Sequence, residues 1–143
     1  MSEALAEAKI ALAEGEVPVG AAVVIDGCLI AKAGNRRNKC SDIFGHAEFL
    51  AIKQAAEKIG DWRLKNAEVY VTLEPCPMCA GIMLQSRIKR LVYGAANILE
   101  GSAGTRINIL DYPGMEHHAD IIGGIKAEES LELLRRFFGS DRV

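Results

Sequence analysis

The chain has 143 residues, half of them hydrophobic, and a formal net charge of −2, with an isoelectric point near 5.9. This length suits one well-packed domain over residues 1–143 and is short for two. The acidic balance excludes a sequence-independent nucleic-acid coat, which needs a clear basic excess to attract phosphate. No apolar run approaches the roughly 18 residues of a membrane span, so we expect a cytoplasmic protein without membrane association.

Hydrophobic periodicity predicts a helix, a β-hairpin, a polar loop and a second helix in the first half of the chain. Apolar residues recur at helical spacing in both helices, and Gly15 and Gly60 are suited to end them. The hairpin strands flank Asp26-Gly27, a dipeptide that tolerates positive φ. These elements cover residues 2–14, 17–25 with 28–34, 35–45 and 47–60.

The second half predicts a strand, helix and strand unit, a glycine-containing surface loop, a short strand and a last helix. The first two of these strands should be parallel, with a right-handed crossover. In the last helix, Leu131, Leu134 and Phe138 share one stripe. Together, about five strands and four helices predict an α/β fold, a three-layer α/β/α domain around a mixed five-stranded sheet. The elements cover residues 67–74, 80–85, 89–94, 95–106, 119–122 and 127–138.

Two of the four cysteines are predicted to be metal ligands. Pro77 is suited to the first position of a helix, which places Cys76 at its cap and Cys79 in its first turn. Free backbone N–H groups and the helix dipole favour thiolate at both positions. Two thiolates three residues apart are natural zinc ligands. We expect Cys28 to be a small core residue and Cys40 an exposed loop thiol.

The sequence His46-Ala-Glu48 supplies an imidazole and a carboxylate where a loop becomes a helix. With His46 as third ligand, zinc keeps one position for water, which is the arrangement of a catalytic site. Residues two apart point about 200° apart on a helix, so His46 and Glu48 must meet the metal end-on. Held outside the ligand shell, Glu48 can take a proton from water and pass it to a leaving group. This division of labour suits hydrolytic removal of an amino group from a heteroaromatic ring.

These two motifs, His46-Ala-Glu48 and Pro75-Cys-Pro-Met-Cys79, resemble the signature of the zinc-dependent nucleobase deaminases. Within that superfamily the chain is most similar to the tRNA adenosine deaminases, over roughly residues 5–138. The likeness also rests on Glu16-Val-Pro-Val-Gly-Ala21, Asn35, Asp61-Trp-Arg-Leu64, Val71-Thr-Leu-Glu-Pro-Cys76, Cys79-Ala-Gly81, Ser86-Arg-Ile88 and Phe137-Phe138.

The resemblance implies a cytidine-deaminase-like fold, one Zn²⁺ per subunit and a homodimer. It implies conversion of adenosine to inosine at the wobble position of a tRNA anticodon loop, with Glu48 moving protons while water attacks C6 of adenine. By the same likeness, the flipped base is contacted by Asn35, lined by Val17, and approached by the backbone amide of Ala47 and by Asn97.

The chain departs from the family on the RNA side of the site. The family usually has Pro-Thr-Ala before the zinc histidine, an Asp at the position of Asn97 and a basic tail, whereas this chain has Ile43-Phe44-Gly45 and ends in Gly-Ser-Asp-Arg-Val. Two alternatives therefore stay open: a deaminase of a free base or nucleoside of the guanine or cytosine type, and a structural zinc module that binds RNA or protein. Basic side chains that are candidates for phosphate contacts are Arg36, Arg37, Lys39, Arg87, Lys89, Arg90, Arg135 and Arg136.

Overall fold

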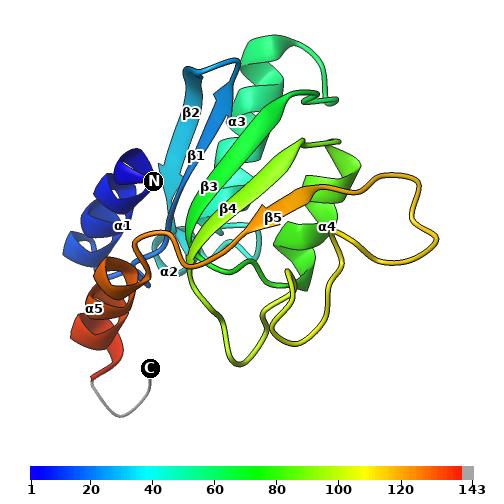
Figure 1. Cartoon of the computed structure of the whole chain (residues 1–143). Helices are drawn as coiled ribbons and strands as arrows, with labels where there is room; N and C mark the ends of the chain where they lie inside the picture. The colour runs from blue at the N-terminus through cyan, green and yellow to red at the C-terminus, as the bar shows by residue number, and fades with distance from the viewer. Residues whose placement is uncertain (140–143) are drawn as a thin grey trace.

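The computed structural model describes residues 1–139 and confirms the predicted α/β architecture, a mixed five-stranded sheet between two layers of helices (Figure 1). The chain ends in Gly-Ser-Asp-Arg-Val in place of a basic tail, and residues 140–143 of this segment lie outside the described range. The strands are β1 (Gly20–Ile25), β2 (Cys28–Gly34), β3 (Ala67–Leu73), β4 (Arg90–Ala95) and β5 (Asp120–Ile122). The helices are α1 (Ser2–Ala13), α2 (Arg37–Cys40), α3 (Ala47–Ile59), α4 (Pro77–Gln85) and α5 (Ala127–Phe138).

The sheet has the strand order β2-β1-β3-β4-β5 and combines antiparallel with parallel pairs. β1 pairs antiparallel with β2 across a turn in which Asp26 and Gly27 both have positive φ, as the dipeptide predicted. β1 also pairs antiparallel with β3. β3 and β4 are parallel and joined through α4, which confirms the predicted strand, helix and strand unit. β5 adds a further parallel strand beside β4.

Helices cover both faces of the sheet, with α1 and α5 on one side and α3 and α4 on the other (Figure 1). The main core contains the apolar residues of β1 and β3, where Val23 lies opposite Val69 and both are fully buried. α1 approaches β1 closely at Gly20, since a Cβ there would lie 2.0 Å from the backbone oxygen of Ala4. Only glycine permits this contact between helix and strand. No helix within residues 1–139 is both long and apolar enough to cross a lipid bilayer.

Three details differ from the sequence expectations. The polar loop after β2 contains the short helix α2, whose stabilising partner lies far away in sequence and is described below. In α5 the fully buried positions are Ser130, Leu133 and Leu134, while Phe138 is 42 % exposed. Cys28 is exposed because it begins β2, an edge strand, directly after the hairpin turn. The predicted core position of Cys28 is therefore wrong.

Candidate metal centre and active-site cavity

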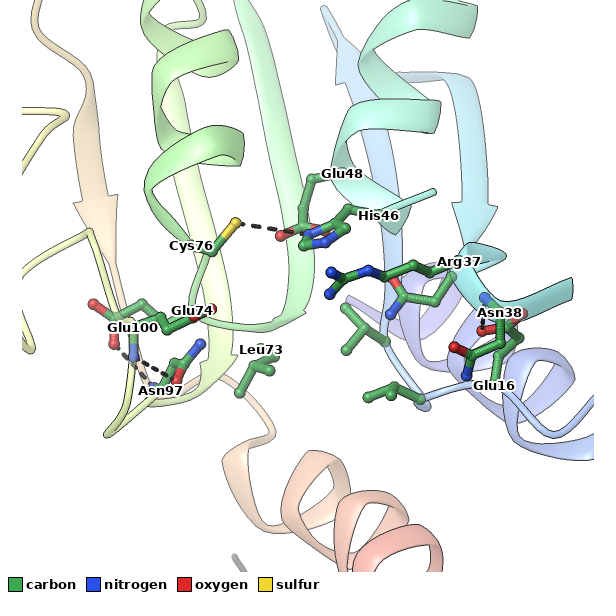
Figure 2. Close-up of a pocket in the computed structure, with 13 residues that line it drawn as sticks. Glu16, Arg37, Asn38, His46, Glu48, Leu73, Glu74, Cys76, Asn97 and Glu100 are labelled. Carbon is green, nitrogen blue, oxygen red and sulfur yellow. Dashed lines mark hydrogen bonds between the residues drawn. The ribbon is translucent and has the colours of Figure 1, made fainter. Parts of the chain in front are cut away.

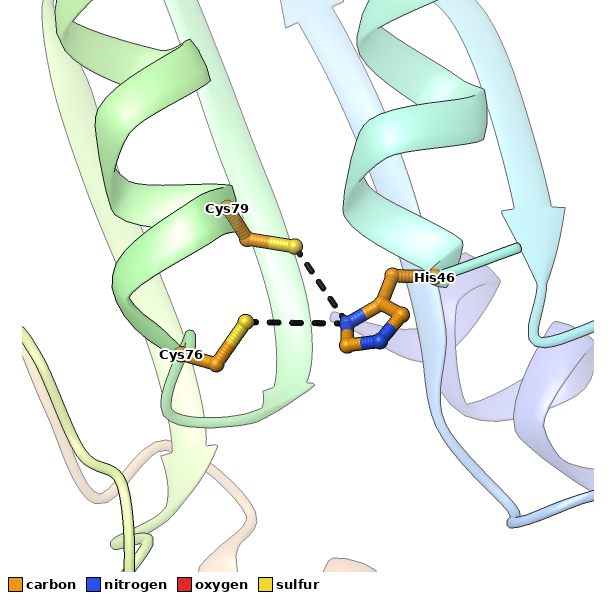
Figure 3. A group of neighbouring side chains, drawn as sticks. All are labelled: His46, Cys76 and Cys79. Carbon is orange, nitrogen blue, oxygen red and sulfur yellow. Dashed lines mark hydrogen bonds between the residues drawn. The ribbon is translucent and has the colours of Figure 1, made fainter. Parts of the chain in front are cut away.

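The metal ligands predicted from sequence come from the first residues of two neighbouring helices. His46 is the N-cap of α3 and Cys76 the N-cap of α4, both with extended backbone, and Pro77 opens α4 as predicted. Neither side chain forms a capping hydrogen bond. Each side chain is therefore available to the space between the two helix ends, where Figure 3 shows His46, Cys76 and Cys79 converging.

The distances between these three side chains fit a tetrahedral zinc ion. His46 Nδ1 lies 3.6 Å from Cys76 Sγ and 3.5 Å from Cys79 Sγ, and all three donor atoms lie within 4.8 Å of one another. With ordinary Zn–S and Zn–N bond lengths, the edge between sulfur and nitrogen in a tetrahedron is about 3.6 Å. Within residues 1–139 this group therefore comprises two thiols and one imidazole at zinc-binding geometry, which is one donor fewer than a tetrahedral ion takes.

The pKa values of the two cysteine thiols are shifted in opposite directions. The Cys79 thiol donates to Cys76, and this bond, with the hydrogen bond and charge of His46, lowers the pKa of Cys76 to about 4. The same bond, with burial, raises the pKa of Cys79. The hydrogen bond with Cys76 also raises the pKa of His46. This arrangement suits a cation, because zinc takes cysteine as thiolate and its binding releases protons.

Glu48 lies in the first turn of α3, two residues after His46, and its side chain is only 4 % exposed. Burial raises the pKa of this carboxyl to about 7. Glu48 does not belong to the group of three donors that can hold a metal ion. Figure 2 shows it beside His46 among the residues that line a cavity. A carboxyl in this position, with a pKa near neutrality, can both accept and return a proton.

The cavity has a volume of about 390 Å³, within the range of small-molecule sites. Its lining includes three of the predicted substrate-binding residues, Val17, Asn35 and Asn97. Ala47 does not line it, and the backbone N–H of Ala47 donates to Asn35 Oδ1 at 2.9 Å. The lining residues are Glu16, Val17, Val19, Asn35, Arg37, Asn38, His46, Glu48, Leu73, Glu74, Cys76, Asn97 and Glu100.

The two asparagines are oriented by bonds to the backbone. Since Asn35 Oδ1 accepts from the N–H of Ala47, the amide NH₂ of Asn35 is left for other partners. Asn97 Oδ1 accepts from the N–H groups of Leu99 and Glu100, at 3.1 and 3.0 Å, and so caps the turn that follows it. Both side chains are therefore fixed by local structure while lining the cavity.

Two buried acids at the cavity were not recognised as site residues from the sequence. Glu16 and Glu74 line it and are each only 1 % exposed. Each lies in a motif that carried the family resemblance, near apolar residues and a proline. A carboxyl group in such surroundings could have been predicted to be buried and paired. Of the basic candidates, Arg37 lines the cavity, whereas Arg87 and Arg135 form ion pairs with acidic neighbours.

Comparison with known proteins agrees with this geometry. Residues 1–95 match the cytidine and deoxycytidylate deaminase zinc-binding region. The chain is 45 % identical over 138 residues to the tRNA-specific adenosine deaminase of Bacillus subtilis, covering 96 % of this chain and 86 % of that one. A structure solved in a study of A-to-I editing by tRNA:A34 deaminases at the wobble position of transfer RNA matches with a TM-score of 0.90 and 42 % identity, covering 94 % of this chain and 97 % of the other.

The guanine deaminase of Nitrosomonas europaea is more distant, with a TM-score of 0.82 and 26 % identity over 95 % of this chain and 81 % of its own. The same architecture is therefore found in a deaminase named for a free base. The family model, the relative of similar length and the zinc-binding triad of donors point to one assignment. The chain belongs to the cytidine and deoxycytidylate deaminase family and, within it, to the tRNA-specific adenosine deaminases.

Proposed function

We propose that this protein is a zinc-dependent hydrolytic deaminase that converts adenosine to inosine at the wobble position of a tRNA anticodon. The observation that supports this most directly is the cavity, whose lining includes His46, Cys76 and the buried Glu48. The kinship with tRNA-specific adenosine deaminases supplies the substrate. By the same kinship we propose that the protein acts in the cytoplasm as a homodimer.

His46, Cys76 and Cys79 are the residues that hold zinc in this proposal. When bound, zinc supplies a Lewis acid that polarises water and makes it easier to deprotonate. Glu48 accepts a proton from that water while an oxygen–carbon bond forms at C6 of adenine. Glu48 passes this proton to N1 of the ring and then moves the remaining proton of the C6 hydroxyl to the amino group. The bond between C6 and the amino nitrogen breaks, ammonia leaves, and C6 becomes the carbonyl of inosine. Because Glu48 is buried, the proton is not lost to bulk solvent during this exchange.

On the substrate side, the free NH₂ of the Asn35 amide is the group we expect to bond to the base. Val17 gives the base an apolar surface, and Asn97 also lines the cavity. The backbone N–H of Ala47 acts through Asn35, since it donates to Asn35 Oδ1. We therefore assign Ala47 the role of orienting Asn35.

A deaminase of a free base is the second candidate, favoured by the structural match to guanine deaminase and by the acidic isoelectric point. The structural-zinc alternative is less compatible with the geometry, because closed structural sites have four protein ligands. Among the described residues the donor group comprises His46, Cys76 and Cys79.

One assay separates these functions. Ammonia release is measured with the zinc-loaded protein from an anticodon stem-loop with adenosine at the wobble position, and from free adenosine, guanine and cytosine. We expect turnover of the stem-loop well above that of the three small molecules. Turnover of a free base with none of the RNA would overturn the proposal, and absence of turnover with every substrate would favour the structural module.

A further inference from the structure

We propose that Glu16 and Glu74 are positioning residues that hold the two opposite walls of the cavity in the shape required by its RNA substrate. This inference rests on the proposed function for the identity of the substrate. Figure 2 shows Glu74 and Asn97 on one side of the cavity, and Glu16 with Asn38 on the other. Both carboxyl groups are buried, and each accepts hydrogen bonds from the backbone of the segment beside it.

Glu74 accepts hydrogen bonds from several residues of the loop that follows β4. One oxygen accepts from the backbone N–H groups of Ala103 and Thr105, both at 3.0 Å. The other accepts from the N–H of Asn97 at 3.1 Å and from the Thr105 hydroxyl. A Cβ at Gly101 would lie 2.4 Å from the same carboxylate, so glycine is required for the loop to close over it. The segment 97–105 is therefore folded around one buried carboxyl group, which also fixes Asn97 through its backbone N–H.

Glu16 performs the equivalent task on the other wall. Its two oxygens accept separately from the first free amides of α2, from Asn38 N–H at 3.1 Å and from Lys39 N–H at 2.6 Å. The first amides of a helix have no partner within the helix, and a carboxylate there also meets the positive end of its dipole. Glu16 thus caps α2 from 22 residues away. In doing so it fixes Arg37 and Asn38 at the cavity.

The requirement is for a carboxylate and not for a polar side chain of the same size. In both residues each oxygen faces at least one backbone N–H. Glutamine would turn one of these oxygens into an NH₂ group, which points a donor at a donor whichever way the amide is oriented. Glu16→Gln and Glu74→Gln therefore loosen one wall each while leaving His46, Glu48 and the cysteines unchanged.

The two walls contact the RNA and not the reacting atoms, so the expected effect lies in KM. For the anticodon stem-loop we expect each variant to raise KM about tenfold while kcat stays within about threefold of the parent protein. Zinc content should remain one per chain. Glu57→Gln, on an exposed position of α3, is the matched control and should change neither constant.

Thr105→Val supplies a second, milder test, because Thr105 is exposed and the change removes the hydroxyl bond to Glu74 while keeping the backbone bond. Thr105→Val should raise KM a few-fold, so that KM increases from the parent protein to Thr105→Val and again to Glu74→Gln. This variant also keeps the inference testable if Glu74→Gln fails to fold. A lowered melting temperature with unchanged KM would reduce both glutamates to structural residues and overturn the inference. If the parent protein acts on a free base and not on the stem-loop, the proposed function fails. In that case KM is measured with the free base for the parent protein, Thr105→Val and Glu74→Gln. A rise of KM in this order would still support the positioning role of Glu74, and equal values would overturn it.

Discussion

Replacement of Glu48 by glutamine tests the proposed chemistry with the smallest possible change. Glutamine has nearly the same size and shape, but its amide cannot accept and return a proton at neutral pH. Glu48 lies outside the donor group formed by His46, Cys76 and Cys79, so Glu48→Gln should leave the zinc ligands in place. The variant therefore separates loss of proton transfer from loss of metal.

The expected loss follows from the position of the side chain. Proton transfer by a positioned group contributes roughly 10² to 10⁴-fold to rate, equivalent to about 3 to 5 kcal/mol of activation free energy. Because Glu48 is only 4 % exposed, solvent water has little access to replace it. We therefore expect kcat to fall toward the upper end of this range. The free energy of unfolding should not fall, because burial disfavours the ionised carboxyl and raises its pKa to about 7.

Three measurements on the same sample check this prediction: ammonia release from the stem-loop, zinc content and urea-induced unfolding. Glu57→Gln on the exposed side of the same helix is the control for removal of one negative charge. A Glu48→Gln protein that keeps its zinc and retains more than about a tenth of the parent kcat would refute the assignment of proton transfer to this residue. Loss of zinc from the variant would instead place Glu48 in the metal's ligand shell.

Three further changes test the site and the fold. Chelation of zinc should abolish turnover and raise the number of fast-reacting thiols from two to three. Two cysteines are exposed already, and chelation frees Cys76, which is half-buried and has its pKa lowered to about 4. An unchanged number of reactive thiols would contradict the metal site. Asn35→Asp keeps the oxygen that binds the Ala47 N–H but loses the NH₂ group, and should lower kcat/KM about 10 to 100-fold without shifting the urea midpoint. Equal kcat/KM would exclude Asn35 from base contacts. Gly20→Ala places a Cβ 2.0 Å from an α1 carbonyl oxygen and should cost about 1 to 3 kcal/mol in urea unfolding. Gly81→Ala has open space and should cost nothing.

Local sequence patterns were sufficient for most elements of the fold. Two strand-like runs around the Asp26-Gly27 turn predicted the hairpin, and helical spacing with Gly60 at its end predicted α3. The parallel arrangement of β3 and β4 followed from the helix between them. The zinc donors were also predictable, because Cys76 and Cys79 share one turn of a helix and proline marks where that helix begins.

The features that escaped prediction depend on contacts between residues far apart in the chain. α2 has four residues, too few to form without a partner, and its first amides are bound by Glu16. The loop after β4 was expected at the surface, yet Gly101 and Ser102 are buried, and the segment around them folds about Glu74. Neither partnership has a local sequence signature. In α5, Ser130 is buried because the helix approaches Gly94 of β4 closely, which apolar spacing alone does not reveal.

Strand direction explains why every part of the site meets at one place. β2 and β3 both run antiparallel to β1 and are therefore parallel to each other, and β4 is parallel to β3. The carboxyl ends of these three strands consequently lie at the same edge of the sheet, and β1 begins there. β2 leads to Asn35, β3 to Glu74 and Cys76, β4 to Asn97, and Glu16 precedes β1.

At this edge of the sheet, the metal donors and the cavity walls are held by different parts of the structure. The metal donors and Glu48 are fixed by the first turns of α3 and α4, which are anchored in the core. The cavity walls are instead held by Glu16 and Glu74 through loop backbone. Because the two supports are distinct, substitutions in the loops can change which substrate is bound while the zinc chemistry is retained. Asn97 and residues 43–45 lie outside the helices and strands. We therefore expect substitutions there to alter KM among RNA substrates before they alter kcat.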